Sequence, residues 1–389
     1  MESTPEFNKQ FDVVIFGDAI SSKNGGSASF VELCLNMKQV YNTVIATRFG
    51  IFDKFVYRHP NYTELQKIHK SFPLHLHDSI YQSESLKRDI INRISIPKLT
   101  KKHISNYSLI IDCYGIVPEK VRTYFKTEVK IARMHNGSVK AFSEYFGNSQ
   151  KKNKDEQLFD YVEMMSKYDG LIFQSESQLT SAKAILGSKI PMVLLPPTSN
   201  ESQLSKVIKL ETNRQHMCLL QIASIQPRKN QLGSLQFLSM LRDQGFDVRI
   251  KFVGPVEDEK YFGELKKFEK QHGLEGYVKY EGFQTDYYRF YKETDLVIIP
   301  SSAEGISRTL RECLFIGKPV ITSEMDGTLD LIKKNVVISM DSEVFKNFDQ
   351  SAVQKYFKEI VENGKLYYDQ NYSLSKYKQR ISDSLRLLV

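Results

Sequence analysis

Short apolar runs alternate along the chain with amphipathic stretches. In the first half of the chain, the apolar runs are rich in β-branched residues and span residues 11–17, 41–47, 108–115, 129–137 and 170–175. Runs of this length and composition are typical of strands buried on both faces, and the stretches between them, such as residues 158–168, have helical periodicity. Strands that alternate with helices in this way predict a doubly wound parallel sheet.

The alternation breaks once and then restarts. The segment LLPPTSNESQ, residues 194–203, has two prolines and a polar tail without the period of a strand or a helix, which predicts an interdomain linker. Beyond it, new apolar runs span residues 216–224, 246–254, 276–283, 295–301 and 318–323, again with helical stretches between them. The sequence therefore predicts an α/β protein with two Rossmann-like doubly wound domains, residues 1–195 and residues 196–389.

The end of the chain is predicted to be helical. From residue 342 onward the sequence is polar with helical periodicity, and its last stretch carries Ile381, Leu385 and Leu388. These apolar residues predict that the final helix packs on one of the two domains, and packing back on the N-terminal domain is one of the two options.

Composition narrows the class of protein. The 389 residues are 41% hydrophobic and 26% charged, which are ordinary values for a globular protein. No run of about 18 apolar residues occurs, and the N-terminal segment MESTPEFNKQ lacks the basic and apolar regions of a secretory signal. We therefore expect a cytoplasmic protein. The four cysteines are far apart in the sequence, which predicts buried reduced thiols.

The net charge of +8 is unevenly distributed. Residues 1–200 carry 26 Lys and Arg against 20 Asp and Glu. A basic first half favours contact with phosphates, an anionic membrane surface or nucleic acid, and a lysine-rich solvated surface gives the same count. The aromatic residues Phe52, Phe55 and Tyr57 permit peripheral contact with an anionic bilayer and a lipid-linked acceptor. The modest charge excess and the lack of a zinc-finger or RNP-like motif argue against nucleic acid.

The segment most specific for a function is PSSAEGISRTLRECLFIGKPVITS, residues 300–323. A predicted strand leads into a glycine-bearing loop, and a helix begins near Ser307 and ends at Gly317. In an open α/β sheet, ligands lie beyond the carboxyl ends of the strands, where helix N-termini point. The backbone amides of Gly305, Ile306 and Ser307 are therefore placed to bind phosphate oxygens.

Two glutamates belong to this segment. Glu304 lies at the tip of the predicted loop, where its carboxylate can accept hydrogen bonds from sugar hydroxyls. Glu312, eight residues on, lies about two turns into the helix and can accept from ribose hydroxyls. The alternative is an ordinary helix-terminal carboxylate and a surface glutamate. The strand, the glycine and the GKPVI segment together favour the functional interpretation.

Residues 300–323 resemble the Glu-x7-Glu signature of the retaining glycosyltransferases related to sucrose, glycogen and lipid-linked mannose synthases. The resemblance is clear over residues 216–335 and weaker, but consistent in order, over residues 11–195. It implies a GT-B fold, in which two Rossmann-like domains face each other across a cleft. It also implies transfer of a sugar from a nucleotide-sugar to a hydroxyl acceptor with retention of anomeric configuration. Glu304 matches the glutamate that faces the donor sugar, and Glu312 matches the glutamate that binds the ribose.

A basic motif extends the resemblance upstream. The segment ASIQPRKNQ, residues 223–231, resembles the motif in which an Arg and a Lys neutralise the donor diphosphate. Lys229 matches the family lysine, whereas Ser224 occupies the usual arginine position, so Arg228 is the expected substitute. Two cations that face a leaving diphosphate suit a transfer without metal, and a solvated basic pair is the alternative.

Five further positions carry the resemblance into both halves. The YEGF segment that ends at Phe283 resembles the one whose backbone reads the nucleobase, and Gly254 ends a strand that faces the nucleotide. Gly25 and Gly26 resemble the glycine loop that closes over the donor diphosphate. His135 matches a histidine near the reactive centre of the sugar.

The resemblance implies no cofactor and no bound metal, with the nucleotide-sugar as donor substrate. The segment HLHD, residues 75–78, offers two histidines in a loop, which are too few ligands for a metal site. The partners implied are a UDP- or GDP-linked donor and a saccharide, lipid-linked or protein acceptor in glycan synthesis.

Three other functions stay open at this point. They are a nucleotide-sugar epimerase on the same fold, a phosphorylase with a lysine-linked pyridoxal cofactor, and a non-catalytic nucleotide-sugar sensor or partner subunit. The Glu-x7-Glu element favours transfer over the first two. The presence of Glu304, Lys229 and Glu312 together argues against the third.

Overall fold

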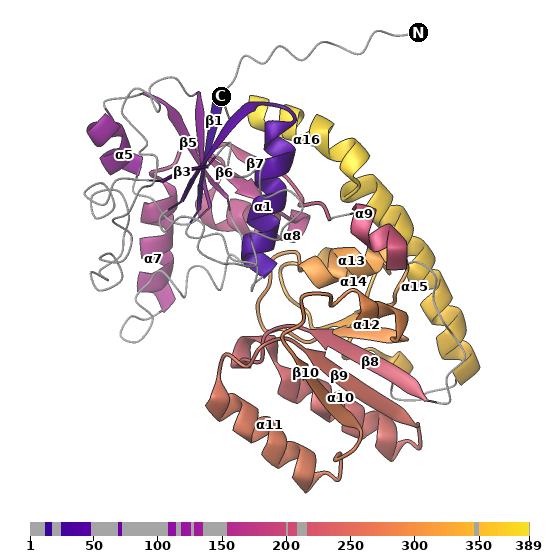
Figure 1. The fold of residues 1–389 in the computed structure, drawn as a ribbon. Coiled ribbons are helices and arrows are strands. Elements are labelled where there is room, and N and C mark those ends of the chain that lie inside the picture. The colour runs from indigo at the N-terminus through magenta and orange to yellow at the C-terminus, as the bar shows by residue number, and fades with distance from the viewer. Residues whose placement is uncertain are drawn as a thin grey trace, which may run out of the picture. The chain divides into compact units, whose positions relative to one another are not determined.

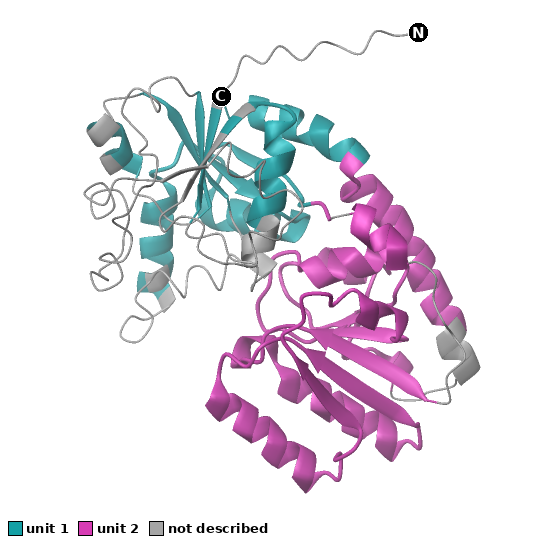
Figure 2. Cartoon of the chain, viewed as in Figure 1, with its two compact units in different colours: residues 1–197, 375–389 teal, residues 198–374 magenta. Residues whose placement is uncertain are grey.

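The computed structural model describes residues 12–17, 25–47, 69–71, 108–113, 118–125, 128–134, 154–199, 201–207, 216–345 and 350–388. The chain divides into two compact units (Figure 2). The first comprises Met1–Pro197 and Ser375–Val389, and the second comprises Thr198–Leu374. The end of the chain therefore belongs to the first unit.

The first unit is built on a parallel sheet with the strand order β3-β2-β1-β4-β5-β6-β7 (Figure 1). Its strands are β1 (Asp12–Gly17), β2 (Asn42–Thr47), β3 (His69–Ser71), β4 (Leu109–Asp112), β5 (Lys130–Met134), β6 (Gly170–Phe173) and β7 (Met192–Leu194). All neighbouring strands pair in parallel, as the β-branched apolar runs predict.

Helices cover both faces of this sheet. They are α1 (Gly25–Lys38), α5 (Pro118–Phe125), α7 (Lys154–Met165), α8 (Glu176–Leu186) and α16 (Leu374–Arg386). Successive side chains of a strand point to opposite faces. Val13 and Ile15 of β1 accordingly pack in one core with α1 and α16, and Val14 and Phe16 pack in the other with α5, α7 and α8. Ile381 belongs to the first of these cores, so α16 closes one face of the sheet.

The second unit repeats the plan with the strand order β10-β9-β8-β11-β12-β13. Its strands are β8 (Met217–Ile222), β9 (Val248–Val253), β10 (Val278–Gly282), β11 (Leu296–Ile299), β12 (Val320–Thr322) and β13 (Ile338–Ser339). Its helices are α9 (Glu201–Leu204), α10 (Gln231–Asp243), α11 (Glu259–Gln271), α12 (Arg289–Lys292), α13 (Arg308–Ile316), α14 (Leu329–Lys333) and α15 (Gln350–Asn371).

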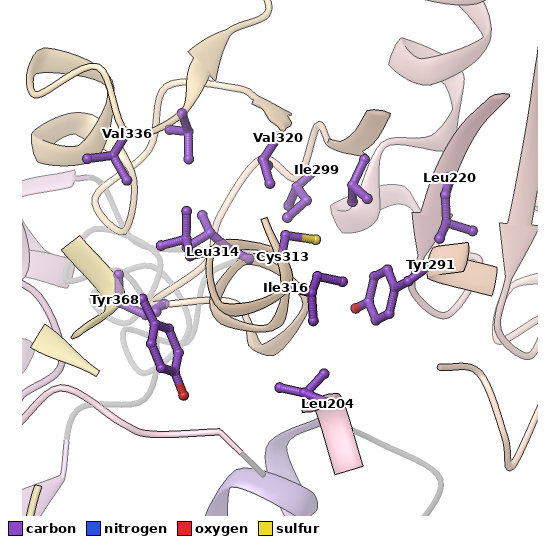
Figure 3. Packing of buried hydrophobic residues seen from close by; sticks show 14 of the residues in the cluster. Leu204, Leu220, Tyr291, Ile299, Cys313, Leu314, Ile316, Val320, Val336 and Tyr368 are labelled. Atoms are coloured by element: carbon purple, nitrogen blue, oxygen red, sulfur yellow. The ribbon is translucent and has the colours of Figure 1, made fainter. Parts of the chain in front are cut away.

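Helix α13 packs in the hydrophobic core on one face of the second sheet. Cys313, Leu314 and Ile316 of α13 pack in one cluster with Ile299 of β11 and Val320 of β12 (Figure 3). On the opposite face, α10 and α11 pack on the sheet in a separate cluster. The position of α13 is therefore set by burial of its apolar side, which leaves its N-terminus at the carboxyl edge of the sheet.

Part of the predicted linker is helical, which corrects the expectation of an irregular segment. Residues 201–204 form α9, and the carboxylate of Glu201 accepts hydrogen bonds from the backbone N–H of Leu374 at 2.8 Å and the hydroxyl of Tyr368 at 3.2 Å. These partners lie far along the chain, so the local pattern could not reveal them. Within the described residues, no helix is long and apolar enough to cross a membrane. The cysteines are free, and three of them are buried.

Candidate active site

The candidate site lies at the carboxyl edge of the second sheet. β8 and β11 are neighbours in the sheet, and the chain continues from them to opposite sides, toward β9 and toward β12. The loops after these two strands therefore diverge at a topological switch point, where open α/β sheets bind ligands. The first loop comprises residues 223–230 and leads into α10, and the second comprises residues 300–307 and leads into α13.

Asn230 joins the two loops. Its backbone is left-handed, with φ 50° and ψ 50°, a conformation that asparagine tolerates better than most residues. Its side-chain oxygen accepts a hydrogen bond from the N–H of Gly233 at 3.1 Å, which caps α10. Its side-chain nitrogen donates to the carbonyl oxygen of Pro300 at 3.1 Å. One residue thus starts a helix and ties the first loop to the second.

The backbone of the basic motif is fixed from two sides. The N–H of Ser302 donates to the carbonyl oxygen of Arg228 at 3.0 Å. The side-chain amide of Gln221 donates to the carbonyl oxygen of Lys229 at 2.8 Å, and Gln221 in turn accepts from the hydroxyl of Ser234 at 2.8 Å. Because these partners are backbone groups or buried side chains, the base of each cationic side chain has a defined position.

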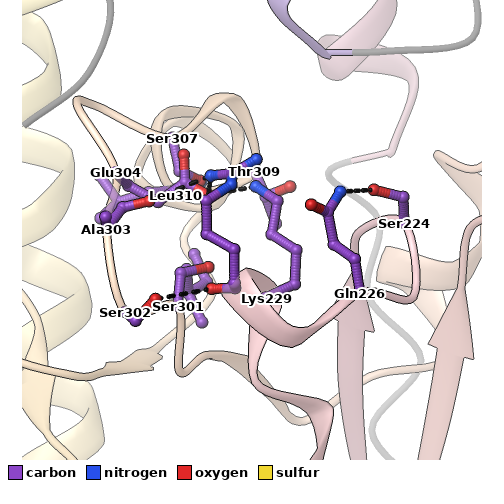
Figure 4. Close-up of polar contacts among 12 residues, drawn as sticks. Ser224, Gln226, Lys229, Ser301, Ser302, Ala303, Glu304, Ser307, Thr309 and Leu310 are labelled. Carbon is purple, nitrogen blue, oxygen red and sulfur yellow. Dashed lines mark hydrogen bonds and ion pairs between the residues drawn. The ribbon is translucent and has the colours of Figure 1, made fainter. Parts of the chain in front are cut away.

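The side chains of Lys229 and Arg228 meet at one oxygen atom of Glu304. Lys229 and Glu304 are labelled in Figure 4. Nζ of Lys229 contacts Oε1 of Glu304, and Nη1 of Arg228 contacts the same oxygen at 3.1 Å. Arg228 also donates to the carbonyl oxygen of Ala303 at 3.0 Å. The Arg228 side chain is 47% exposed, whereas those of Lys229 and Glu304 are 19% and 14% exposed. The structure therefore brings three predicted residues together in a cluster with a net positive charge.

The second loop delivers a helix N-terminus to the cluster. Gly305 and Ile306 are buried, and Ser307 precedes α13 with an extended backbone. The Ser307 hydroxyl accepts a hydrogen bond from the N–H of Leu310 at 3.1 Å, so it caps the helix. Gly317 ends the helix in the left-handed conformation, with φ 74°. The helix thus begins and ends where the sequence predicts, and the positive end of its dipole at the N-terminus favours an anion.

The loop after β12 also reaches this site, which the sequence analysis missed. A β-carbon placed on Gly327 would fall on the carbonyl oxygen of Gly305. The backbones of the two loops therefore pack directly against each other, and a side chain at position 327 has no room. The available signal was an isolated glycine shortly after a predicted strand, a pattern that marks close backbone approach.

Glu312 is buried rather than on the surface, so the alternative of a surface glutamate is wrong. Its side chain is 1% exposed, and Nε of Arg308 lies 3.0 Å from Oε1. The hydroxyl of Tyr287 donates to Oε1 at 2.7 Å, and that of Tyr291 donates to Oε2 at 2.6 Å. Burial, together with the adjacent Glu312 charge, raises the pKa of both tyrosines well above the ordinary value. Both hydroxyls therefore keep their protons at neutral pH and act as donors.

The ends of β8, β9 and β10 approach closely beside the first loop. Gly254 has φ 153°, and a β-carbon placed there would fall on the carbonyl oxygen of Ala223. The N–H of Gly254 donates to the carbonyl oxygen of Gly282 at 2.9 Å. Phe283 follows directly and is 37% exposed, which is unusual for a large apolar side chain in this unit. Gly254 and Phe283 are thus at the same sheet edge as the cationic cluster.

The serine at the expected arginine position has its own partner. The amide nitrogen of Gln226 donates to Oγ of Ser224 at 2.7 Å and to Oε2 of Glu257 at 2.6 Å. Ser224 therefore holds the first loop in shape and supplies no charge, which leaves Lys229 and Arg228 as the cations of this loop.

The remaining predicted site residues belong to the first unit. Gly25 and Gly26 occupy the first turn of α1, at the carboxyl end of β1. His135 lies outside the described residues, as do residues 75–78 and the aromatic residues Phe52, Phe55 and Tyr57. In the part of the chain that the structure describes, no three His, Cys, Asp or Glu side chains gather as metal ligands would.

A buried ion pair joins β4 and β5 in the first unit. Nη1 of Arg133 contacts Oδ2 of Asp112 at 2.7 Å, and the hydroxyl of Tyr168 donates to the same oxygen at 2.6 Å. Asp112 is fully buried and Arg133 is 4% exposed. The pair therefore fixes the carboxyl end of β5, directly before the segment that contains His135.

Comparison with known proteins adds a family match for the second unit. Residues 202–378 match the family model described as glycosyl transferases group 1. The chain is 30% identical over 132 residues to the amylovoran biosynthesis glycosyltransferase AmsK of Erwinia amylovora, and the match covers 31% of each chain. It is 26% identical over 139 residues to protein CapJ of Staphylococcus aureus, with 34% of each chain covered. The matches thus span about a third of the length of these relatives.

Solved structures match the chain over almost its whole length. The crystal structure of Anabaena HepE in complex with UDP-glucose has a TM-score of 0.67 and 14% identity, and the match covers 97% of this chain and 99% of that chain. At this identity the likeness shows the fold alone. It confirms the predicted fold class, two parallel-sheet Rossmann-like domains as in GT-B structures.

Proposed function

Through residues 202–378 the chain belongs to the glycosyl transferases group 1 family, and from this premise we propose that it is a retaining glycosyltransferase. The enzyme transfers a sugar from a nucleotide-sugar to a hydroxyl acceptor. The observation that carries the proposal is the cluster of Lys229, Arg228 and Glu304 at the switch point of the second sheet. Two cations, a helix N-terminus and one carboxylate are the groups that a sugar diphosphate requires.

The roles divide between the phosphate and the sugar. Lys229 and Arg228 neutralise the diphosphate as it leaves, together with the first-turn amides of α13. Glu304 accepts hydrogen bonds from hydroxyls of the transferred sugar. Gly254 and Phe283 lie where the nucleoside is held, at the ends of β9 and β10.

The roles in the first unit rest on the resemblance of its motifs. Gly25 and Gly26, in the first turn of α1, let a backbone approach the donor closely. His135 acts near the reactive centre on the acceptor side. These assignments are part of the proposal.

The donor is a nucleotide-linked sugar, and UDP is the first nucleotide to test. The support is that HepE, which shares the fold over its whole length, was crystallised with UDP-glucose. A GDP-linked sugar fits the same cluster, because the cations and helix amides bind the diphosphate and not the base.

The acceptor belongs to a glycan under construction, most simply a polysaccharide repeat. The support is the name of AmsK, an amylovoran biosynthesis glycosyltransferase, which matches a third of this chain. Saccharide, lipid-linked and protein acceptors are all consistent with a hydroxyl acceptor. A cytoplasmic location with peripheral contact to an anionic membrane is part of this proposal, supported by the basic first half.

A thermal-shift screen with UDP, GDP, ADP and their sugar conjugates tests the donor proposal. A ligand that binds only the folded state raises the melting temperature by mass action. We expect one nucleotide series to stabilise the protein, and the Lys229→Ala variant to lose that shift. Hydrolysis or transfer from the matching sugar conjugate then distinguishes an enzyme from a non-catalytic sensor. No shift with any nucleotide would overturn the proposal.

A further inference from the structure

The chain passes between its two units at two places. The first crossing follows Pro197, and the second follows Leu374. On the second unit's side, the residues beside both crossings are buried: Thr198 and Ser199 are each 3% exposed, and Ser373 is 8% exposed. Both crossings therefore start from the interior of the second unit rather than from a solvated surface loop.

One carboxylate joins the two crossings. Glu201, the first residue of α9, lies shortly after the first crossing. Its Oε1 accepts hydrogen bonds from the N–H of Leu374 at 2.8 Å and from the hydroxyl of Tyr368 at 3.2 Å. Leu374 is the first residue of α16, and the first-turn amides of a helix have no partner within that helix. The carboxylate therefore caps a helix whose later residues belong to the first unit, and these three residues form the crossing joint.

The crossing joint packs against α13. The ring of Tyr368 meets that of Phe315 in α13, with centroids 5.1 Å apart and an interplanar angle of 63°. Leu314, also in α13, belongs to one hydrophobic cluster with Tyr368 (Figure 3). Nη1 of Arg311, which is fully buried in α13, lies 3.4 Å from Oγ of Ser199 beside the first crossing. The helix whose N-terminus belongs to the candidate site is therefore in contact with residues at both crossings.

The other end of α16 lies in the core of the first unit. Ile381 and Leu385 belong to the same buried cluster as Ile15 of β1. The hydroxyl of Ser384 donates to the carbonyl oxygen of Leu194 in β7 at 2.9 Å. With 13 residues, α16 is a single element about 20 Å long. It starts at the crossing joint and is fixed along its length in the core of the first unit.

We propose that Glu201 couples donor binding to the first unit. A nucleotide-sugar that binds at the start of α13 stabilises that helix, the crossing joint that packs on it, and thereby the first turn of α16. Coupling of this kind travels through packed side chains and rigid elements. Glu201 is a positioning residue, because it acts through α13 and α16 and not on the substrate. The inference rests on the proposed nucleotide-sugar function and adds a route by which the donor site and the acceptor-side unit affect each other.

The chemistry of the joint requires an acceptor more than a charge. Both donors are neutral, since one is an amide N–H and the other a phenol. Burial, together with the Glu201 charge, raises the pKa of Tyr368, so its hydroxyl keeps its proton at neutral pH. Glutamine at position 201 keeps an oxygen at the same reach, whereas alanine removes the acceptor from both donors. The two substitutions therefore separate a joint that is made from one that is broken.

The test measures one coupling in two ways. Hydrogen exchange of a peptide that covers residues 372–378 is followed by mass spectrometry with and without UDP, or GDP if the thermal-shift screen selects it. Calorimetry gives the dissociation constant of the same nucleotide. The proteins are the wild type, Glu201→Ala and Glu201→Gln. Asp295→Ala is the matched control, because the Asp295 carboxylate also accepts from a backbone N–H, that of Cys218, at 2.8 Å, but at the amino-terminal edge of the second sheet.

In the wild type we expect UDP to slow exchange of this peptide about fivefold, the low end of coupling between two sites, because exchange requires the joint to open. Coupling is reciprocal, so Glu201→Ala should bind UDP more weakly by the same factor and should lose the effect of UDP on exchange. Glu201→Gln and Asp295→Ala should match the wild type in both measurements. If Glu201→Ala does not fold, Glu201→Asp is measured in its place, because it withdraws the carboxylate by one methylene.

Three results would overturn the inference and leave the proposed function standing. The first is a wild type that binds UDP without slower exchange of the peptide. The second is equal slowing in the wild type and Glu201→Ala, which would show that the coupling bypasses Glu201. The third is a Glu201→Ala variant with a lower melting temperature and unchanged UDP affinity, whose carboxylate would be structural alone. A wild type that binds no nucleotide would overturn the proposed function and this inference together.

Discussion

Lys229 and Glu304, 75 positions apart in the chain, form an ion pair across the two loops of the switch point. Arg228 contacts the same Glu304 oxygen. The two cations are the groups that would bind a diphosphate, and the carboxylate is the group that would accept from a sugar hydroxyl. In the structure these ligand-binding groups are paired with one another. Binding of a sugar diphosphate must therefore weaken these ion pairs and use both charges at once.

Removal of the Glu304 charge should strengthen the binding of free UDP. In Glu304→Gln the cations no longer have a competing carboxylate, and partly exposed ion pairs contribute up to about 1 kcal/mol each. We expect calorimetry to show UDP binding about threefold tighter, which corresponds to somewhat less than 1 kcal/mol. Sugar transfer should fall at least about a hundredfold, as when one group that stabilises the transition state is removed.

The control for this prediction is a carboxylate paired with a lysine elsewhere in the unit. Glu293 contacts Lys251, and its side chain is 51% exposed. Glu293→Gln removes the same charge from the same unit and should change neither UDP affinity nor transfer. Weaker UDP binding by Glu304→Gln would show that the carboxylate does not compete for the cations.

The two cations should differ in their importance for transfer. Lys229 is 19% exposed and its backbone is held by Gln221, whereas the Arg228 side chain is 47% exposed. The less solvated charge interacts more strongly with a phosphate. We expect Lys229→Ala to lower kcat/KM by about a hundredfold or more and Arg228→Ala by about tenfold. Equal losses in steady-state kinetics would contradict this ranking.

The alternation of apolar runs was sufficient to predict the fold class. β1 and β8, two of the strands predicted from their runs, are buried along most of their length, because strands buried on both faces need a continuous β-branched sequence. β10 was predicted from its run too, although it is an edge strand whose residues are half-buried or exposed. β13 has two residues and β7 has three, so neither has a period to detect. The helix α9 was missed because the groups that donate hydrogen bonds to the carboxylate of its first residue, Glu201, come from Tyr368 and Leu374.

The residues of the candidate site could be predicted where they lie within a short sequence motif. Glu304, Lys229 and Arg228 were each named from a motif, and the structure places them in contact. Tyr287 and Tyr291 were not named, because their role depends on Glu312, which is 21 to 25 positions away. A buried carboxylate requires donors, and only the fold shows which tyrosines supply them.

Gly327 should be intolerant of even the smallest side chain. Because a β-carbon there would fall on the carbonyl oxygen of Gly305, Gly327→Ala must displace the second loop. We expect denaturant unfolding to show a loss of about 1–3 kcal/mol, typical of overpacking, and UDP affinity to fall with it.

The matched glycine control is Gly263, which lies within α11 and faces open space where a methyl group would be added. Alanine is favoured over glycine inside a helix, so Gly263→Ala should stabilise the protein by about 0.5–1 kcal/mol and leave UDP affinity unchanged. A Gly327→Ala variant as stable and active as the wild type would show that the two loops do not pack as the structure has them.

The buried tyrosines should make the stability fall at alkaline pH. Burial and the Glu312 charge raise the pKa of Tyr291 in the folded protein, whereas an unfolded tyrosine titrates near its usual pKa of about 10. Above about pH 10 the unfolded chain therefore binds fewer protons than the folded one, and the free energy of unfolding decreases as the pH rises. Tyr291→Phe lacks this group and should lose stability less steeply, by up to about 1.4 kcal/mol per pH unit.

Urea unfolding from pH 7 to pH 11 measures the gap in free energy of unfolding between Tyr291→Phe and the wild type. We expect a constant gap up to about pH 9, with the variant less stable because Glu312 loses a donor, and a narrowing gap above pH 10. A gap that stays constant to pH 11 would show that Tyr291 titrates alike in both states, and so that its hydroxyl is not held by Glu312.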